Sequence, residues 1–193
     1  MKKTVKNKEI INSNIIQGIH NLKSLKNNKY QTLIFDIFRV CLRAIKNKKK
    51  IIFCGNGGSA ADSQHLTAEL VSKFLKVRKP LPAISLTTNT SSLTSIGNDF
   101  GYDYIFSKQL SALGSKGDVL IALSTSGKSK NVIKGLKTAK EKEIFTVLFT
   151  GEKIKQKKNC DIIFNAPATR VDRIQEIHIL VGHILCELIE NEI

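Results

Sequence analysis

The chain has 193 residues, of which 41% are hydrophobic and 24% charged, values typical of a soluble globular domain in which no apolar run approaches the roughly 20 residues of a membrane span. Its formal net charge is +15 at pH 7, but only five of the 31 basic residues are Arg, the residue preferred for base and phosphate recognition. Because the lysines are spread along the chain, we interpret the charge as a basic surface that gathers anionic substrates, and we expect neither a nucleic-acid nor a membrane partner.

The N-terminal segment "MKKTVKNKEIINS" is basic, but neither an apolar stretch nor a small-residue cleavage site follows it. We therefore expect a cytoplasmic protein, and the four scattered cysteines, which form no CxxC pair, are typical of reduced thiols. Apolar residues recur at helical spacing over residues 8–26 and 29–47, which predicts two amphipathic helices.

Five short apolar runs follow, at residues 50–55, 82–86, 118–124, 145–151 and 161–167. Nearly continuous runs are typical of strands covered on both faces. Helical stretches are predicted between and after them, at residues 59–75, 102–112, 129–142 and 171–192. The alternation predicts an α/β fold with a parallel five-stranded sheet between helical layers. We expect a single domain over 1–193, with N-terminal helices in 1–48 and the α/β core and C-terminal helix in 49–193.

Two strand ends carry loops suited to an anion, "GNGGS" at residues 55–59 and "STSGKS" at residues 124–129. Glycines allow close approach of the backbone, the following helix offers free N–H groups, and hydroxyls add donors. For either loop alone, capping of the next helix by Ser59 or Ser129 is an equal alternative.

Neither loop completes a nucleotide motif. The first fits a relaxed dinucleotide fingerprint, but the second strand ends in "TTN" without the required carboxylate. The second copies the end of a Walker loop, whose first glycine is replaced by Ala122. Two partial anion loops favour a small phosphorylated ligand, for which a phosphosugar is the natural candidate.

His65 and Glu69 stand at positions i and i+4 of the helix after the first loop. This spacing suits two ligands of one metal, although a surface ion pair is its commoner meaning. Gln175, His178 and His183 interrupt the apolar stripe of the last helix, where a lone histidine is more often a hydrogen-bonded core residue than a ligand. Gln175 and His183 lie about 12 Å apart along a helix axis, so both reach one ion only with extended side chains, a bent helix or separate subunits.

The chain resembles the phosphoheptose isomerases of the sugar-isomerase (SIS) domain fold over almost its whole length. The resemblance is carried by "CGNGGSAADSQHLTAEL", "SIGNDFGYDYIFSKQ", "GDVLIALSTSGKSKNVI" and "DRIQEIHILVGHIL". It implies conversion of sedoheptulose 7-phosphate to D-glycero-D-manno-heptose 7-phosphate, the first step of heptose precursor synthesis for bacterial surface polysaccharide. It also implies a zinc cofactor and a homotetramer with active sites at subunit interfaces.

The resemblance also implies roles for individual residues. Its substrate-binding positions are Asn56, Gly57, Gly58, Glu69, Asn98, Asp99, Ser124, Thr125, Ser126, Ser129 and Gln175. Its zinc ligands are His65, Glu69, Gln175 and His183. We assign Glu69 as the base and His183 as the acid of an enediol mechanism, with zinc polarising the carbonyl.

Two alternatives remain beside this interpretation. A non-catalytic relative of the same fold binds the replication initiator DnaA, but it lacks the acidic residue and the final histidine that this chain has as Glu69 and His183. An isomerase of another phosphosugar is the second alternative, because chain-length selectivity depends on pocket shape. The chain departs from the family at Ala60, where some members have histidine, and in the loop "EKIKQKKN", which lacks the paired glycine often found there.

Overall fold

The computed structural model describes residues 2–152 and 160–193 of the chain, so most of the loop "EKIKQKKN" lies outside the described residues. Its five strands are β1 (Ile51–Gly55), β2 (Ala83–Ser85), β3 (Val119–Leu123), β4 (Phe145–Gly151) and β5 (Ile162–Ala166). All neighbours pair in parallel, in the order β2-β1-β3-β4-β5. Every residue of β1 and β3 is buried, as continuous apolar strands require. The predicted α/β fold is confirmed.

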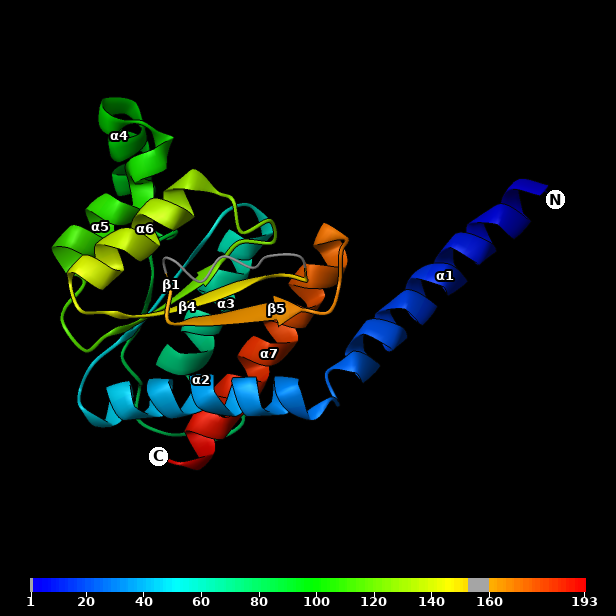
Figure 1. Ribbon diagram of the computed structural model, residues 1–193, viewed down its shortest axis with the longest axis horizontal. Helices are drawn as coiled ribbons and strands as arrows, with labels where there is room; N and C mark the ends of the chain where they lie inside the picture. Colours follow the sequence, from blue (N-terminus) through cyan, green and yellow to red (C-terminus); the bar gives the residue numbers. More distant parts are fainter. Residues whose placement is uncertain (1, 153–159) are drawn as a thin grey trace.

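Helices cover both faces of the sheet (Figure 1). The helices α2 (Asn28–Lys46), α3 (Gly58–Val71) and α7 (Val171–Asn191) pack on one face, and α5 (Ile105–Leu113) and α6 (Lys130–Glu141) pack on the other. Since side chains alternate along a strand, Ile121 of β3 belongs to the first core layer and Leu120 to the second. The connecting helices change face between β1 and β3, and ligands of open α/β sheets bind at such a switch point.

The main differences from the predicted helices concern the first helix, α3 and a helix between β2 and β3. The first helix, α1 (Lys2–Ser24), begins six residues earlier than residue 8, and α3 ends at Val71 rather than at 75. A helix that was not predicted, α4 (Thr90–Phe100), precedes a short 3-10 turn and α5. Its Ser, Thr, Asn and Gly residues have weak helix propensity. Its one sequence signal is Asn89, whose side chain accepts a bond from the Ser92 amide at 2.9 Å.

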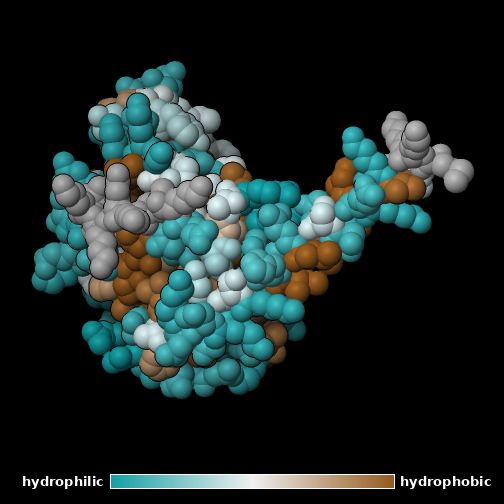
Figure 2. Space-filling view, turned by 45° about the vertical axis from the view of Figure 1, so that its right-hand side comes forward, coloured by the Kyte–Doolittle hydropathy of each residue, from teal (hydrophilic) through white to brown (hydrophobic). Residues whose placement is uncertain are grey.

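The first helix projects from the body of the molecule and carries apolar side chains along its exposed length (Figures 1 and 2). The exposed apolar residues of α1 are Val5, Ile10, Ile11, Ile15, Ile16, Ile19 and Leu22. A monomer rarely exposes an apolar patch of this size.

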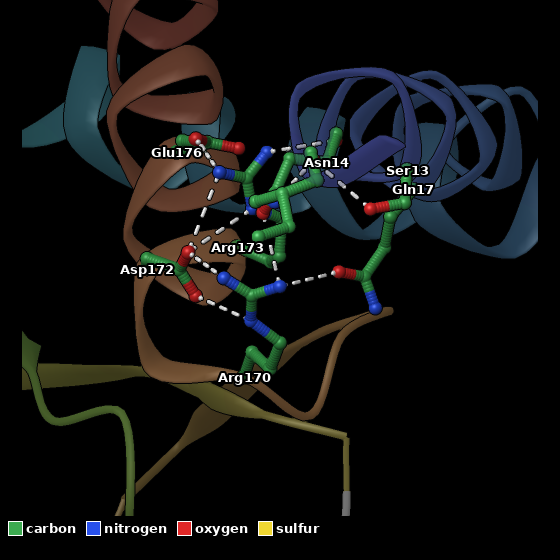
Figure 3. Close-up of polar contacts among 8 residues, drawn as sticks. Ser13, Asn14, Gln17, Arg170, Asp172, Arg173 and Glu176 are labelled. Atoms are coloured by element: carbon green, nitrogen blue, oxygen red, sulfur yellow. Dashed lines mark hydrogen bonds and ion pairs between the residues drawn. The ribbon is translucent and has the colours of Figure 1, made fainter. Parts of the chain in front are cut away.

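Two arginines attach α1 to the beginning of α7 (Figure 3). The Arg170 guanidinium donates to Asn14 Oδ1 at 3.0 Å and forms an ion pair with Asp172 at 2.6 Å. Arg173 donates to the Asn14 carbonyl at 3.4 Å and pairs with Glu176 at 2.9 Å. The direction of the projecting helix is therefore set by polar contacts at its middle, while its apolar side chains remain exposed.

The four cysteines are buried and unpaired. Burial raises the pKa of Cys41, Cys54 and Cys186 to about 12, which keeps these thiols protonated and unreactive. Among the described residues, no helix combines the length and the apolar character that crossing a membrane demands.

Candidate active site

The first loop turns sharply from β1 into α3. Gly57 has φ +56°, a conformation that costs glycine little, and a Cβ at Gly58 would lie 2.5 Å from Gln175 Nε2. Gly57 is the N-cap of α3, and no side chain caps this helix end. Ser59 lies inside the helix, where its carbonyl accepts the Ser63 hydroxyl at 2.7 Å. The capping role considered for Ser59 is therefore wrong, and the positive end of the helix dipole is open to an anion.

The second loop joins β3 to α6 in a similar way. Ser129 is the N-cap residue of α6, but its side chain does not cap the helix. Its oxygen instead accepts the Ser124 hydroxyl at 3.1 Å, while Ser126 Oγ accepts the Lys128 amide at 3.2 Å. Ser129 therefore occupies the N-cap position considered for it, but without the side-chain hydrogen bond of a cap. The loop presents hydroxyls and a helix N-terminus together, which is the chemistry of a phosphate site.

An amide pair joins the two loops. Asn56 Nδ2 donates to Asn131 Oδ1 at 2.9 Å, and Asn131 Nδ2 donates back to Asn56 Oδ1 at 2.8 Å. The Tyr102 hydroxyl donates to the same oxygen of Asn56 at 3.1 Å. Asn56 was predicted to bind substrate, whereas its side-chain oxygen is already occupied by two protein donors. Sequence reasoning missed Asn131 and Tyr102, because their only signal is proximity to recognised motifs.

Three predicted metal ligands converge between α3 and α7. The Nε2 atoms of His65 and His183 lie 2.9 Å apart, and Glu69 Oε1 lies 3.2 Å from His65 Nε2. One ligand atom from each of the three residues lies within 4.8 Å of the others. The two helices run in the same direction, because Gln175 meets Gly58 near their beginnings and Gly182 meets Leu66 further along.

The chemistry of this cluster fits zinc. Two imidazole nitrogens and one carboxylate oxygen are common zinc ligands, and ligands of a tetrahedral zinc lie about 3.3 Å from one another at bond lengths of about 2.0–2.1 Å. The observed separations of 2.9 and 3.2 Å are close to that spacing. Burial and the neighbouring His65 lower the pKa of His183 against the attraction of Glu69. The neutral imidazole is the form that binds a metal.

Gln175 lies toward the substrate loops rather than among the other three predicted ligands. Its amide is placed against Gly58, whereas His183 is placed against His65. On α3, His65 stands seven positions after Gly58, and on α7, His183 stands eight positions after Gln175. Parallel packing thus explains why the beginning and the middle of α7 both face α3, and metal ligation by Gln175 stays a prediction.

Asn98 and Asp99 lie on α4, which buries none of its residues. The Asn98 amide donates to Asp99 Oδ1 at 2.8 Å. In residues 2–152 and 160–193, no hydrogen bond connects either side chain to the two loops. Their contact with sugar stays a prediction.

Two further ionisable groups accompany the cluster. Burial raises the pKa of Asp62 to about 6, against the attraction of His65, and its Oδ2 atom has no partner among the described residues. Sequence reasoning missed Asp62, which stands three residues before His65.

His178 is fully buried, and its Nε2–H donates to the Thr150 carbonyl at 3.2 Å. The interpretation of His178 as a core residue is confirmed.

Two of the cavities on the described surface bear on the position of the site. The larger, about 890 Å³, lies at the N-terminal edge of the strands between α2 and the end of α6, and none of the predicted site residues lines it. The smaller, about 250 Å³, is lined by Thr125, Ser126 and Lys128 and by the beginning of α7. The predicted phosphate loop therefore lines the smaller cavity, at the opposite end of the sheet from the larger one, whereas none of His65, Glu69 and His183 lines it.

The chain is an α/β protein with two loops suited to an anion at the switch point of its parallel sheet, and the family model of the SIS domain matches residues 19–151. A phosphoheptose isomerase of Clostridium acetobutylicum is 51% identical over 172 residues, 89% of this chain and 88% of that protein. One of Sulfurimonas denitrificans is 44% identical over 100% of this chain and 97% of its own length.

Solved structures agree with these sequence comparisons. The phosphoheptose isomerase of Francisella tularensis superposes with a TM-score of 0.90 at 32% identity, covering 96% of this chain and 98% of that one. That of Neisseria gonorrhoeae gives 0.87 at 39% identity, covering 95% and 98%. The chain belongs to the phosphoheptose isomerase family of SIS-domain proteins. It is accordingly a sugar-phosphate isomerase.

Proposed function

We propose that the protein converts sedoheptulose 7-phosphate into D-glycero-D-manno-heptose 7-phosphate with the help of zinc. The observation that carries this proposal is the convergence of His65, Glu69 and His183 on α3 and α7, about two helical turns along α3 from its uncapped N-terminus. The family relationship supports the substrate, and the cluster supports the chemistry. The non-catalytic alternative is disfavoured, because a protein that only binds a partner has no need of this donor set.

Binding begins with the phosphate. We assign it to the loop that contains Ser124, Thr125, Ser126 and Ser129, which precedes the N-terminus of α6 and lines a cavity with Thr125 and Ser126. Gly57 and Gly58 bring the first loop close to the sugar, and Gln175 lies beside Gly58 to contact it. We place Asn98 and Asp99 on the sugar hydroxyls, and Asn56 mainly holds the loops together.

The reaction moves one proton between carbons and another between oxygens. Glu69 removes the proton from C1 of the ketose and returns it to C2, which passes through an enediol. His183 exchanges the proton between the two oxygens. Positioned groups of this kind each contribute about 10²–10⁴-fold in rate. A zinc ion held by His65, Glu69 and His183, with Gln175 as the predicted fourth ligand, would polarise the carbonyl and stabilise the charge that develops on oxygen.

The test is direct. The purified protein is incubated with sedoheptulose 7-phosphate, with added zinc and with a chelator, and aldose formation is followed by NMR. We expect conversion that zinc restores after chelation. Absence of conversion under every condition would refute the proposed reaction.

We further propose that residues 1–193 act as one unit within a cytoplasmic homotetramer, and that the reaction opens heptose precursor synthesis for surface polysaccharide. The exposed apolar residues of α1 support assembly, since they are covered only when subunits associate. The buried, unreactive thiols are compatible with a reducing compartment.

A further inference from the structure

A single arginine binds the end of the helix that carries the proposed base. Arg78 Nη2 donates to the Glu69 carbonyl at 2.8 Å, and Nη1 donates to the carbonyls of Leu70 at 2.8 Å and Ser72 at 3.0 Å. The last carbonyls of a helix lack partners within it, and a cation there also complements the helix dipole. Arg78 thereby caps α3 at the backbone of Glu69 itself.

A buried carboxylate holds the segment that follows α3. Glu190, near the end of α7, accepts bonds from the amides of Phe74 at 3.2 Å, Leu75 at 2.8 Å and Lys76 at 3.0 Å. It also pairs with Arg78 Nε at 3.1 Å, and the two side chains are only 8% and 1% exposed. The bonds from Leu75, Phe74 and Lys76 and the charge of Arg78 lower the pKa of Glu190, outweighing its burial.

The segment 74–76, which Glu190 binds, contacts His183, the second proposed catalytic residue. The Phe74 ring stacks on the His183 ring, with centroids 5.5 Å apart and an angle of 20° between the planes. The Arg78–Glu190 ion pair therefore contacts both proposed catalytic residues indirectly. Arg78 binds the backbone of Glu69, and Glu190 binds the backbone of Phe74, whose ring stacks on His183. The other interactions of Arg78 and Glu190 are with backbone groups, so substrate does not need to touch either residue.

We infer that Arg78 and Glu190 are positioning residues that hold Glu69 and His183 in the geometry required for metal binding and proton transfer. This inference rests on the proposed function. A planar guanidinium can reach several carbonyls at once, whereas a lysine ammonium of similar charge cannot reproduce that fork. Small displacements of ligating or reacting groups reduce affinity and rate strongly, even when the displaced residues are intact.

The experiment compares wild-type protein with Arg78→Lys and Glu190→Gln. Zinc affinity is measured by competition with a chelator, and kcat and KM are measured with sedoheptulose 7-phosphate. We expect each variant to lose about 10- to 100-fold in zinc affinity and a similar factor in kcat, with KM changed by less than about threefold, since neither residue contacts the phosphate loop.

The matched control is Asp118→Asn. Asp118 is 1% exposed, accepts the amides of Lys50 at 3.1 Å and Ser115 at 2.8 Å, and pairs with the Lys50 ammonium at 2.6 Å. It is thus a similar buried carboxylate, placed just before β3, and its polar partners Lys50 and Ser115 belong to neither α3 nor α7. We expect the control to lower the melting temperature while zinc affinity and kcat of the folded protein stay as in the wild type.

The outcomes separate the inference from the proposed function. Wild-type zinc affinity and kcat in Glu190→Gln, with only the melting temperature lowered as in Asp118→Asn, would overturn the inference, and so would a wild-type protein that binds no zinc. If the wild type binds zinc but does not isomerise the substrate, the proposed function fails and the zinc affinities alone decide the inference. If Glu190→Gln does not fold, Phe74→Leu decides, and an unchanged kcat there contradicts positioning of His183.

Discussion

A substitution of Glu69 should distinguish the chemical step from substrate binding. Its carboxylate lies 3.2 Å from His65, and in the proposed mechanism it carries the proton between carbons. Glu69→Gln keeps the size of the side chain but removes the basic oxygen. We expect turnover to fall on the order of 10³-fold, about 4 kcal/mol, with little change in KM, because the lost interaction belongs to the transition state.

Steady-state kinetics with sedoheptulose 7-phosphate measure this effect, and His65→Ala is the comparison. The comparison variant keeps the proposed base but loses one proposed ligand, so its zinc affinity should fall. Near-normal turnover in Glu69→Gln would reduce Glu69 to a structural ion-pair partner of His65.

His178 makes the stability of the protein depend on pH. Burial lowers its pKa from 6.5 to about 4 in the folded protein, against the bond to Thr150. Above pH 6.5 the imidazole is neutral in both states and adds no pH dependence. Between pH 6.5 and about 4 the unfolded chain binds a proton that the folded protein does not, so stability falls as pH falls. At pH 5 the loss is about 2 kcal/mol at roughly 1.36 kcal/mol per pH unit.

His178→Gln tests this linkage, because glutamine retains an N–H donor for the Thr150 carbonyl but does not titrate. Urea unfolding at pH 7 and at pH 5 gives the stability difference for each protein. We expect the variant to lose less stability than the wild type on acidification. Equal losses in both proteins would show that His178 is not the group responsible.

Two elements meet at the amide pair of Asn56 and Asn131, which links the loop before α3 to the first turn of α6. Asn131→Ala leaves both polar atoms of the Asn56 amide without this partner and lets the two loops separate. We expect KM for the sugar phosphate to rise about 10-fold, in line with a net contribution of about 0.5–1.5 kcal/mol from each of the two lost hydrogen bonds. Tyr102→Phe removes a single bond to Asn56, so its KM should rise less.

Kinetics at a temperature where all three proteins are folded provide the measurement. An unchanged KM in Asn131→Ala would mean that the loops hold their positions without the amide pair.

Elements with a strong apolar period could be predicted from sequence, and those defined by polar contacts could not. The strands and α2, α6 and α7 were anticipated because burial repeats along them, and the apolar runs of β1 and β3 are wholly buried. By contrast, α4 buries no residue and is signalled only by its cap. The end of α3 depends on Arg78, whose partners are backbone carbonyls nearby in space.

The candidate site divides in the same way. Glycine-rich turns and the His65–Glu69 spacing are local patterns, so they indicated an anion loop and a ligand pair. The approach of His183 to His65 depends on how α3 and α7 pack, which no local pattern specifies. Asn131 and Glu190 act through partners at least 75 positions away in the sequence, and such pairs are invisible in a single chain without its fold.

At the scale of the whole molecule, the exposed face of α1 leads to a prediction about assembly. Ile11 and Ile15 are 60% and 56% exposed on a helix that projects from the body. We expect the wild-type protein to be a tetramer in light scattering, and the double variant Ile11→Glu/Ile15→Glu to dissociate, because charges are costly inside an apolar interface. Asn12→Glu adds a negative charge at an exposed polar position of the same helix and should remain assembled. A monomeric wild type at micromolar concentration would contradict the prediction.

The parallel packing of α3 and α7 also limits how the gene can change in length. Gly58 meets Gln175, His65 meets His183, and the segment after α3 meets Glu190. Each inserted or deleted residue in a helix turns everything beyond it by about 100°. A single insertion between Gly58 and His65 would therefore carry the proposed base and its histidine off the shared face together, however conservative the inserted residue. In α3 and α7, positions whose side chains make none of these contacts can be substituted, but the number of residues between the contacts cannot change.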